Sequence, residues 1–234
     1  MQVAESLFNR KGNWRRLPAF GSIISASNGA AMAIIRTMRW AGAIALATVT
    51  LAQAGPLTVV QVAAPDVNCV FNASCTITVT DSTGHIPLPF AAGTPFLQSR
   101  TFAGAPGTPA AGLTGYEYRV DLRSASGAID CQLGLVVDFG PVKALPYKAG
   151  ATAHVYVVTQ GGLGTIGIKS AEQDGNVIEF TFEHPLCVSG APNSGPSTFF
   201  FGLASAKPPQ PISAGMWGFG TPAYISIDAR APMH

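Results

Sequence analysis

The chain has 234 residues and a formal net charge of +2, and only 11% of its residues are charged, against about 25% in an average soluble domain. Hydrophobic residues make up 47% of it, a content that excludes an intrinsically disordered chain. The basic excess lies at the N-terminal end, because six of the fourteen basic residues but only one of the twelve acidic residues precede Gly55. The part from Gly55 onward carries a net charge of −3, which excludes the concentrated basic face that nucleic-acid binding requires.

A secretory signal peptide is predicted before Gly55. Arg36 and Arg39 precede an uncharged run, 40–51, which is followed by the small-x-small sequence Ala52-Gln53-Ala54 that a signal peptidase accepts. The run is too short to cross a bilayer, which takes roughly 20 apolar residues. We therefore expect cleavage after Ala54 and a secreted or periplasmic protein, with no membrane span after the leader.

The leader of 54 residues is long, and Met32 offers a second start that would leave a leader of ordinary length. We expect Met32 to be the true start. The pair Arg15-Arg16 suggests a twin-arginine signal instead, but Pro18 and Asn28 interrupt the apolar region that would follow it. The expected organisation is therefore a leader over 1–54 and one domain over 55–234, long enough to bury a substantial core.

Strands with alternating apolar and polar side chains are predicted along the whole domain. The clearest example is 116–123, where Tyr116, Tyr118 and Val120 alternate with charged residues, which we expect to form a solvated face. The other predicted strands are 57–63, 75–80, 96–102, 129–139, 152–159, 164–170, 176–183, 199–201 and 224–228. Gly/Pro-rich loops are expected over 84–95, 103–114, 188–196 and 206–222.

Turn signals predict how some of these strands pair. Asp174-Gly175 is typical of a type I′ hairpin, and Gly161-Gly162 is expected to turn the chain in the same way. The strands 152–159, 164–170 and 176–183 would then form an antiparallel meander. After Gly55 no stretch of ten or more residues keeps a helical period without Gly or Pro. These features predict an all-β, single antiparallel β-sandwich, with a β-barrel as the alternative.

Two disulfides are expected from the four cysteines, because all of them follow the predicted cleavage site and their number is even. Cys69 and Cys75 are within reach across a tight turn, which predicts the pairs Cys69–Cys75 and Cys131–Cys187. A zinc site is the alternative, but the chain has no C-x-x-C pair. We expect no metal and no cofactor.

The sequence Gly162-Leu163-Gly164-Thr165-Ile166-Gly167 matches the G-x-G-x-x-G fingerprint of dinucleotide-binding proteins. That fingerprint requires a helix that begins at the third glycine, whose N-terminus binds the pyrophosphate. The residues that follow Gly167 are predicted to be a strand. We therefore interpret these glycines as turn residues.

Hydrolytic signatures are absent from the sequence: there is no G-x-S-x-G elbow and no S-x-x-K. Four acids predicted on polar strand faces, Asp130, Asp138, Glu179 and Glu183, could support glycoside hydrolysis if two of them met in a cleft. The simpler interpretation is that they are separate surface charges. Asp81-Ser82-Thr83-Gly84 and Asp174-Gly175-Asn176 offer too few acids for an EF-hand-type calcium loop and are interpreted as turns.

Trp217 and Phe219 are the candidate binding residues, because both rings fall in an expected Gly/Pro-rich loop. Exposed loop aromatics can stack on sugars or dock a partner. The alternative is that both rings fold under the loop and fill one end of the sandwich.

In size, leader and β content the chain resembles small exported bacterial β-sandwich proteins, although no motif ties it to one family. The leading hypothesis is an exported, non-enzymatic binding or structural module of the cell envelope or exterior, with carbohydrate or an envelope component as its partner. The alternative is a secreted polysaccharide hydrolase with paired carboxylates.

Overall fold

Two six-stranded sheets form the framework of the protein. The computed structural model describes residues 55–188, 190–191, 194–219 and 224–233, all within the unit that spans 49–234. Sheet A has the strand order β1 (Gly55–Leu57), β12 (Ile168–Asp174), β13 (Val177–Cys187), β8 (Cys131–Asp138), β15 (Pro209–Phe219) and β16 (Ile225–Pro232). Sheet B has the order β2 (Val59–Ala63), β11 (Val155–Gln160), β14 (Phe200–Ser205), β6 (Thr114–Asp121), β5 (Phe96–Ala103) and β3 (Thr80–His85). The predicted leader, Met32 and the cleavage site lie outside the described residues.

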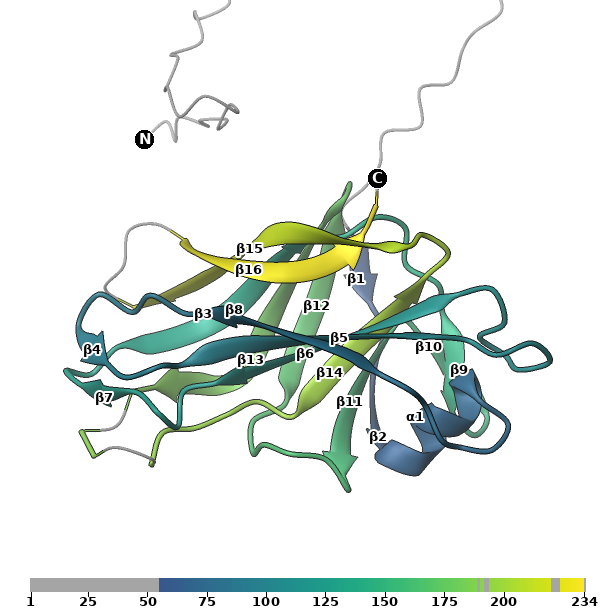
Figure 1. Ribbon diagram of the computed structural model, residues 1–234, viewed down its shortest axis with the longest axis horizontal. Helices are drawn as coiled ribbons and strands as arrows, with labels where there is room; N and C mark the ends of the chain where they lie inside the picture. The colour runs from purple at the N-terminus through teal and green to yellow at the C-terminus, as the bar shows by residue number, and fades with distance from the viewer. Residues whose placement is uncertain (1–54, 189, 192–193, 220–223, 234) are drawn as a thin grey trace, which may run out of the picture. The chain divides into compact units, whose positions relative to one another are not determined.

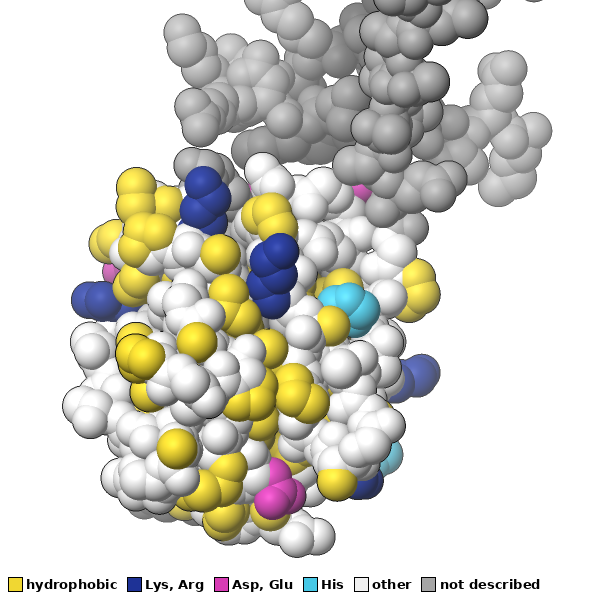
Figure 2. All heavy atoms as spheres, turned by 90° about the vertical axis from the view of Figure 1, so that its right-hand side faces the viewer, with side chains coloured by type: hydrophobic (Ala, Val, Ile, Leu, Met, Phe, Trp, Pro, Cys, Tyr) yellow, Lys and Arg dark blue, Asp and Glu magenta, His cyan; other side chains and the backbone are white. Residues whose placement is uncertain are grey.

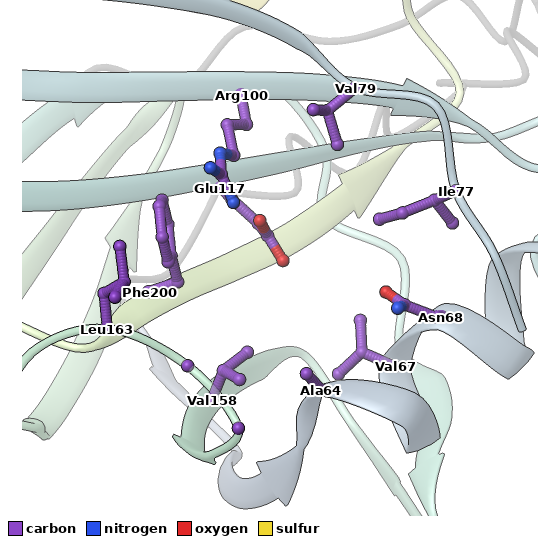
Figure 3. Close-up of a pocket in the computed structure, with 12 residues that line it drawn as sticks. Ala64, Val67, Asn68, Ile77, Val79, Arg100, Glu117, Val158, Leu163 and Phe200 are labelled. Carbon is purple, nitrogen blue, oxygen red and sulfur yellow. The ribbon is translucent and has the colours of Figure 1, made fainter.

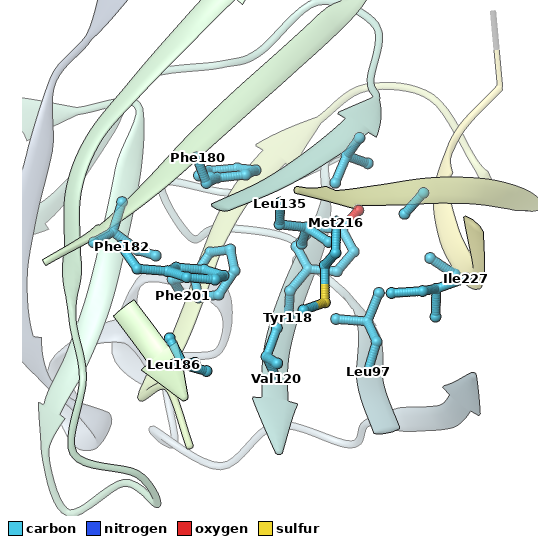
Figure 4. Close-up of a cluster of buried hydrophobic side chains, with 14 of the residues drawn as sticks. Leu97, Tyr118, Val120, Leu135, Phe180, Phe182, Leu186, Phe201, Met216 and Ile227 are labelled. Atoms are coloured by element: carbon cyan, nitrogen blue, oxygen red, sulfur yellow. The ribbon is translucent and has the colours of Figure 1, made fainter. Parts of the chain in front are cut away.

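The two sheets pack face to face, as the predicted sandwich requires (Figure 1). Alternate side chains of each strand point into the space between the sheets, where Phe180 and Met216 of sheet A meet Tyr118 and Phe201 of sheet B (Figure 4). The rings of Phe180 and Phe201 lie 4.9 Å apart. The Tyr118 hydroxyl crosses this core and donates a hydrogen bond to the Arg230 carbonyl on β16. The sandwich is confirmed, and the strands form two separate sheets instead of the alternative closed barrel.

The first two strands of the unit join the two sheets at one edge. β1 pairs with β12 in sheet A, and after Thr58 the chain continues as β2, which pairs with β11 in sheet B. The β2–β11 pair is parallel, whereas the other strand pairs of the described residues are antiparallel. At the opposite edges, Gly84 of β3 lies so close to the backbone of Asp228 on β16 that a Cβ atom would not fit. The edges of the two sheets are therefore joined on one side and in contact on the other.

A third, partial layer covers the outer face of sheet B. It contains the helix α1 (Ala64–Phe71) and the two-stranded ribbon of β9 (Leu145–Lys148) and β10 (Ala151–Ala153). A second hydrophobic cluster forms beneath it, in which Phe71 and Tyr147 pack on Tyr156 and Phe200. Another short ribbon joins β4 (Ala91–Ala92) to β7 (Ser126–Gly127). No layer of this kind was expected from the sequence.

The helix α1 has eight residues, fewer than the ten over which a helical period was considered in the sequence. Its buried residues Val67, Val70 and Phe71 follow the i, i+3, i+4 spacing of one helix face. Proline in the first turn is compatible with a helix start. The negative charge of Asp66 in the same turn interacts favourably with the positive end of the helix dipole. The Asn72 N–H bonds to the Asn68 carbonyl at the C-terminal end.

Several predicted strand boundaries are wrong. The segment 75–79 keeps the expected alternation, with Ile77 and Val79 partly buried, but it pairs with no strand of the described chain, and β3 begins only at Thr80. The strand expected over 164–170 begins at Ile168. The loop expected over 206–222 is wrong for 209–219, which form the long strand β15.

One of the two predicted hairpins is present and the other is not. β12 and β13 form the expected hairpin, in which Asp174 pairs with Val177. The central residues are therefore Gly175 and Asn176, and only Gly175 has a positive φ, so the turn is not the type I′ turn expected at Asp174-Gly175. At Gly161-Gly162 the chain does not form a hairpin, because β11 lies in sheet B and β12 in sheet A. The predicted three-stranded meander is wrong for this reason.

Both predicted disulfides are confirmed. Cys131 and Cys187 are paired neighbours on β8 and β13, and their bond lies within sheet A. The Cys69–Cys75 bond joins α1 to the start of the segment 75–79. Within the described part of the chain, no helix has the length and apolar character needed to cross a membrane.

Charged side chains are sparse on one side of the unit (Figure 2). Figure 2 faces the side of the unit where α1 and β9 lie in Figure 1, and there a few isolated charges stand among hydrophobic and uncharged polar side chains. Uncharged polar groups therefore form much of the contact with water on this side.

Candidate functional site

The polar face of β6 is buried, which corrects the expected solvated face. Glu117, Arg119 and Asp121 are only 6%, 4% and 2% exposed. Their side chains point away from the core between the sheets, as the alternation predicts, but the third layer and neighbouring side chains cover them. These three charged groups are therefore held in a largely water-free environment.

Glu117 lies in a register row that crosses sheet B. Arg100 of β5 pairs with Asp81 of β3 on one side and with Glu117 on the other. On the far side of Glu117 the row continues through Gly202 of β14 to Tyr156 of β11. Tyr156 is thus two strands away from the carboxylate with which it interacts.

Gly202 makes the contact between Tyr156 and Glu117 possible. A Cβ atom at Gly202 would lie 2.5 Å from the Tyr156 hydroxyl oxygen, so the tyrosine side chain occupies the space above this glycine. The Tyr156 hydroxyl then donates a hydrogen bond of 3.1 Å to Glu117 Oε1. Glycine here is required by the close approach of a side chain and not by backbone conformation.

Glu117 forms part of the floor of a pocket of about 290 Å³ (Figure 3). Its carboxylate points into the space between α1 and the opposite wall, next to the Arg100 guanidinium (Figure 3). Three segments that are far apart in sequence form the walls. These are α1 with Ala64, Val67 and Asn68, the segment 75–79 with Ile77 and Val79, and the loop after β11 with Gly161, Gly162 and Leu163. Val158 and Phe200 complete a lining that is mostly apolar.

Burial raises the pKa of the Glu117 carboxyl from its ordinary value of 4.5 to about 7. The hydrogen bond from Tyr156 and the positive charge of Arg100 favour the ionised form but do not cancel the effect of burial. Glu117 is therefore divided between its neutral and ionised forms near neutral pH. A carboxyl group in this state can accept a hydrogen bond, donate one, or pair with a cation.

Arg100 is positioned by two neighbours. Its Nε donates a hydrogen bond of 2.8 Å to Asp81, and its guanidinium lies 4.0 Å from the centre of the Phe200 ring. These contacts hold the cation at one side of the pocket floor. The charge of Arg100 is already paired with Asp81, so it is only partly available to Glu117.

Asp121 is the centre of a separate charge cluster on the same face of sheet B. Arg119 and Arg123 both form ion pairs with its carboxylate, at 3.0 and 2.6 Å. Burial favours the neutral acid, but the hydrogen bonds from Arg123 and the charge of Arg119 outweigh it, and the pKa of Asp121 is lowered. This acid is fully engaged and is therefore a structural ion-pair group.

The four acids considered for hydrolysis have different surroundings. Asp130 is buried and accepts a hydrogen bond from Gln132, whereas Glu179 and Asp138 are exposed on sheet A. Glu183 accepts hydrogen bonds from the Gly167 N–H and the Gln61 amide, and so connects β13 to the loop before β12. Of five pockets formed by the described residues, none is lined by two of these acids.

The predicted aromatic residues lie at the end of β15 on sheet A, remote in the fold from the Glu117 pocket. Met216 belongs to the core, so Trp217 points to the outer face, where its indole covers Gly134 of β8. Trp217 is partly buried there, Phe219 is 64% exposed, and Tyr224 covers Gly215 on the same face. Both predicted rings are therefore residues of β15, with Trp217 on the outer face of sheet A and Phe219 exposed at the end of the strand, and they neither lie in a loop nor fill the end of the sandwich.

The glycine motif lies in a loop between the two sheets, as turn residues, but not in the hairpin that was expected. Among the described residues no helix begins at Gly167, in agreement with the rejection of a dinucleotide site. The loop instead carries the chain from sheet B to sheet A, and its residues Gly162 and Leu163 form one wall of the pocket. Gly164 packs on the Thr198 backbone with a φ of +105°, which favours glycine.

The described residues contain no cluster of three or more side chains that could hold a metal ion. Comparison of the chain with protein-family models, with curated proteins and with solved structures finds no match. The geometry of the Glu117 pocket is therefore the basis for the functional proposal.

Proposed function

We propose that the chain is an exported, disulfide-stabilised binding protein that holds a small amphiphilic molecule in the Glu117 pocket and performs no chemistry on it. The observation that carries this proposal is the buried carboxylate that points into an apolar-walled pocket. Binding sites for small molecules are commonly concave and mostly apolar, with a few polar groups that fix the orientation of the ligand. Glu117, Arg100 and Asn68 are the polar groups here.

Export is part of the proposal and has two supports. The predicted leader carries the features of a signal peptide, and the two disulfides are of a kind that persists in oxidising compartments. N-terminal sequencing of the exported protein, expected to begin at Gly55, tests this part.

The absence of chemistry follows from the arrangement of acids around Glu117. Glycoside hydrolysis uses two carboxyl groups that flank the scissile bond. Glu117 is the sole carboxylate in the lining of its pocket, and the nearby Asp81 is paired with Arg100. One carboxyl group with one paired arginine is suited to recognition.

The pocket can be tested by filling it. Ile77→Trp places an indole in the wall formed by the segment 75–79, and Ile129→Trp is the matched control because Ile129 is 81% exposed outside the pocket. Medium-chain amphiphiles should shift the methyl NMR signals of Val79 and Val158 in the wild type and in Ile129→Trp. Ile77→Trp should abolish these shifts. Equal shifts in all three proteins would contradict binding in this pocket.

A second candidate function, glycan binding, is favoured by the outer face of sheet A. Trp217 of β15 and Tyr224, the residue before β16, lie on this face, and Ser213 and Ser226 supply hydroxyl groups nearby. Flat aromatic rings with polar neighbours can stack on sugar rings. A glycan array should then lose signal with Trp217→Ala but not with Phe90→Ala, a control at another exposed ring.

A further inference from the structure

The charges that face Glu117 leave its carboxylate without a dedicated partner. Asp81 of β3 and Arg100 of β5 form one pair, and Tyr156 of β11 and Tyr147 of β9 are the titratable groups on the other side. Burial raises the pKa of both tyrosines, so they remain neutral. Within the described walls, α1, the segment 75–79 and the loop 161–163 place no charged side chain in the lining.

The neighbouring Arg119 does not supply the missing counterion. Its guanidinium pairs with Asp121 at 3.0 Å. The groups that act on the Glu117 carboxyl are Tyr156, Arg100 and Asp81. The Nε of Arg119 donates a hydrogen bond to Gln98, further along the face. An ionised Glu117 is therefore a buried negative charge with one hydrogen bond and a cation that is bound elsewhere, an arrangement that is unfavourable unless a counterion is present.

Building on the proposed small-molecule function, we infer that the ligand is a protonated amine with an aliphatic body, which binds as the counterion of Glu117. The ammonium group would meet the carboxylate on the pocket floor, and the aliphatic body would contact Val67, Ile77 and Val79. A carboxylate ligand would meet a like charge at Glu117. An alcohol would leave the buried charge uncompensated.

Arg100 narrows the ligand class to molecules with one positive charge. Its guanidinium occupies the Phe200 side of the pocket floor, so a second ammonium group on the ligand would meet a cation there. The structure therefore favours a monoamine over a diamine of the same chain length.

Protons and the amine should compete for Glu117. With a pKa of about 7, the carboxyl is ionised at pH 8 and mostly neutral at pH 5.5. An amine that stays protonated through this range has to displace the proton in acid, and its affinity should fall about thirtyfold between the two values. Capture at neutral or alkaline pH and release in acid would follow.

Isothermal titration calorimetry on the full folded domain with n-hexylammonium, 1,6-diaminohexane, 1-hexanol and hexanoate tests the inference. At pH 8 hexylammonium should bind more tightly than the other three, and its affinity should fall about thirtyfold at pH 5.5. Glu117→Gln should remove both the preference for the amine and the pH dependence. Glu179→Gln removes an exposed glutamate on sheet A and should behave as the wild type.

The outcomes separate the inference from the proposed function. Hexanol or hexanoate bound at least as tightly as the amine, and lost in Ile77→Trp, would overturn the amine assignment while the pocket remains a binding site. Unchanged amine affinity in Glu117→Gln would overturn it as well. No binding of any of the four probes at millimolar concentration would overturn the proposed function and the inference together.

Discussion

At the scale of single residues, the protein is distinguished by a carboxyl group that burial keeps partly protonated near neutral pH. Glu117 loses most of its contact with water beneath α1, and the hydrogen bond from Tyr156 compensates only part of that loss. The unfolded chain has the ordinary pKa of 4.5, whereas the folded state has a pKa of about 7. Between these two values the folded protein holds a proton that the unfolded chain has released.

Replacing Glu117 by Gln should stabilise the protein in a pH-dependent manner. In the wild type the proton on Glu117 contributes to the free energy of unfolding at low pH, and this contribution is lost as the pH rises from 4.5 through 7. Each unit of pKa shift corresponds to about 1.4 kcal/mol, so the total loss is about 3 kcal/mol. Glu117→Gln should thus gain about 3 kcal/mol at pH 8 and almost nothing at pH 4. Urea unfolding of both proteins at the two pH values measures this. An equal difference at both values would contradict the raised pKa.

Removing the Tyr156 hydroxyl should raise the pKa of Glu117 further. Its hydrogen bond favours the ionised carboxylate, so Tyr156→Phe takes away a contribution that lowers the pKa. The matched control is Tyr147→Phe, since the Tyr147 ring lies 4.6 Å from that of Tyr156 but its buried hydroxyl has no hydrogen-bond partner among the described residues. Carbon-detected NMR titration of the Glu117 carboxyl should show an upward shift in the first variant alone.

The sequence predicted the direction of the Glu117 side chain but not its environment. The alternation in 116–123 correctly separates the core residues Tyr116 and Tyr118 from the charged ones. Glu117 is covered by groups from elsewhere in the chain, among them α1 across the pocket and the Tyr156 side chain, and alternation carries no information about a third layer. The one available signal was the spacing of Val67, Val70 and Phe71 after a Pro-Asp helix start.

At the scale of elements, the Cys69–Cys75 disulfide connects two walls of the pocket. α1 carries Val67 and Asn68 on one wall, and the segment that begins at Cys75 carries Ile77 and Val79 on the next. That segment pairs with no described strand, so the disulfide and apolar packing hold it in place. The Cys131–Cys187 bond lies within sheet A and lines none of the five pockets.

The two disulfides should therefore have separable effects. The chain-entropy model assigns about 2 kcal/mol to the bond that closes six residues and about 4 kcal/mol to the one that closes 56. The double variant Cys69→Ser/Cys75→Ser should lose ligand binding with a modest loss of stability. Cys131→Ser/Cys187→Ser should lose more stability but, where it folds, keep ligand affinity. Chemical unfolding combined with calorimetry distinguishes them, and the reverse order of effects would contradict this assignment.

At the scale of the whole molecule, the sequence predicted a sandwich but not which sheet each strand joins. Asp174-Gly175 marks a hairpin because the strands on both sides of it are partners. Gly161-Gly162 carries a similar turn signal, yet there the chain passes from sheet B to sheet A. The difference is set by contacts with β14 and β13, which lie further along the chain, so a local turn signal cannot distinguish the two cases.

The passage between the sheets should be sensitive to substitution at Gly164. Its φ is +105°, and an added Cβ would collide with the Thr198 backbone, so Gly164→Ala should cost about 3 kcal/mol or more. Gly112→Ala is the matched control, because Gly112 also has a positive φ, of +74°, but nothing lies within 4 Å of its added Cβ. That variant should cost about 1 kcal/mol. If thermal unfolding showed the same loss of stability in Gly164→Ala and Gly112→Ala, the collision with the Thr198 backbone would not explain the effect.

The direct connection of β1 in sheet A to β2 in sheet B has a consequence for the order of folding. β1 and β2 are the first strands of the unit to be synthesised, but Gly55 pairs with Gln173, more than 100 residues later in the chain. The same delay applies to β2, whose partner β11 begins at Val155. Pairings between such distant segments close late and slow the folding of β proteins. A nascent chain therefore carries an open sandwich, with the apolar residues of 59–62 unpaired until the β11 segment has emerged.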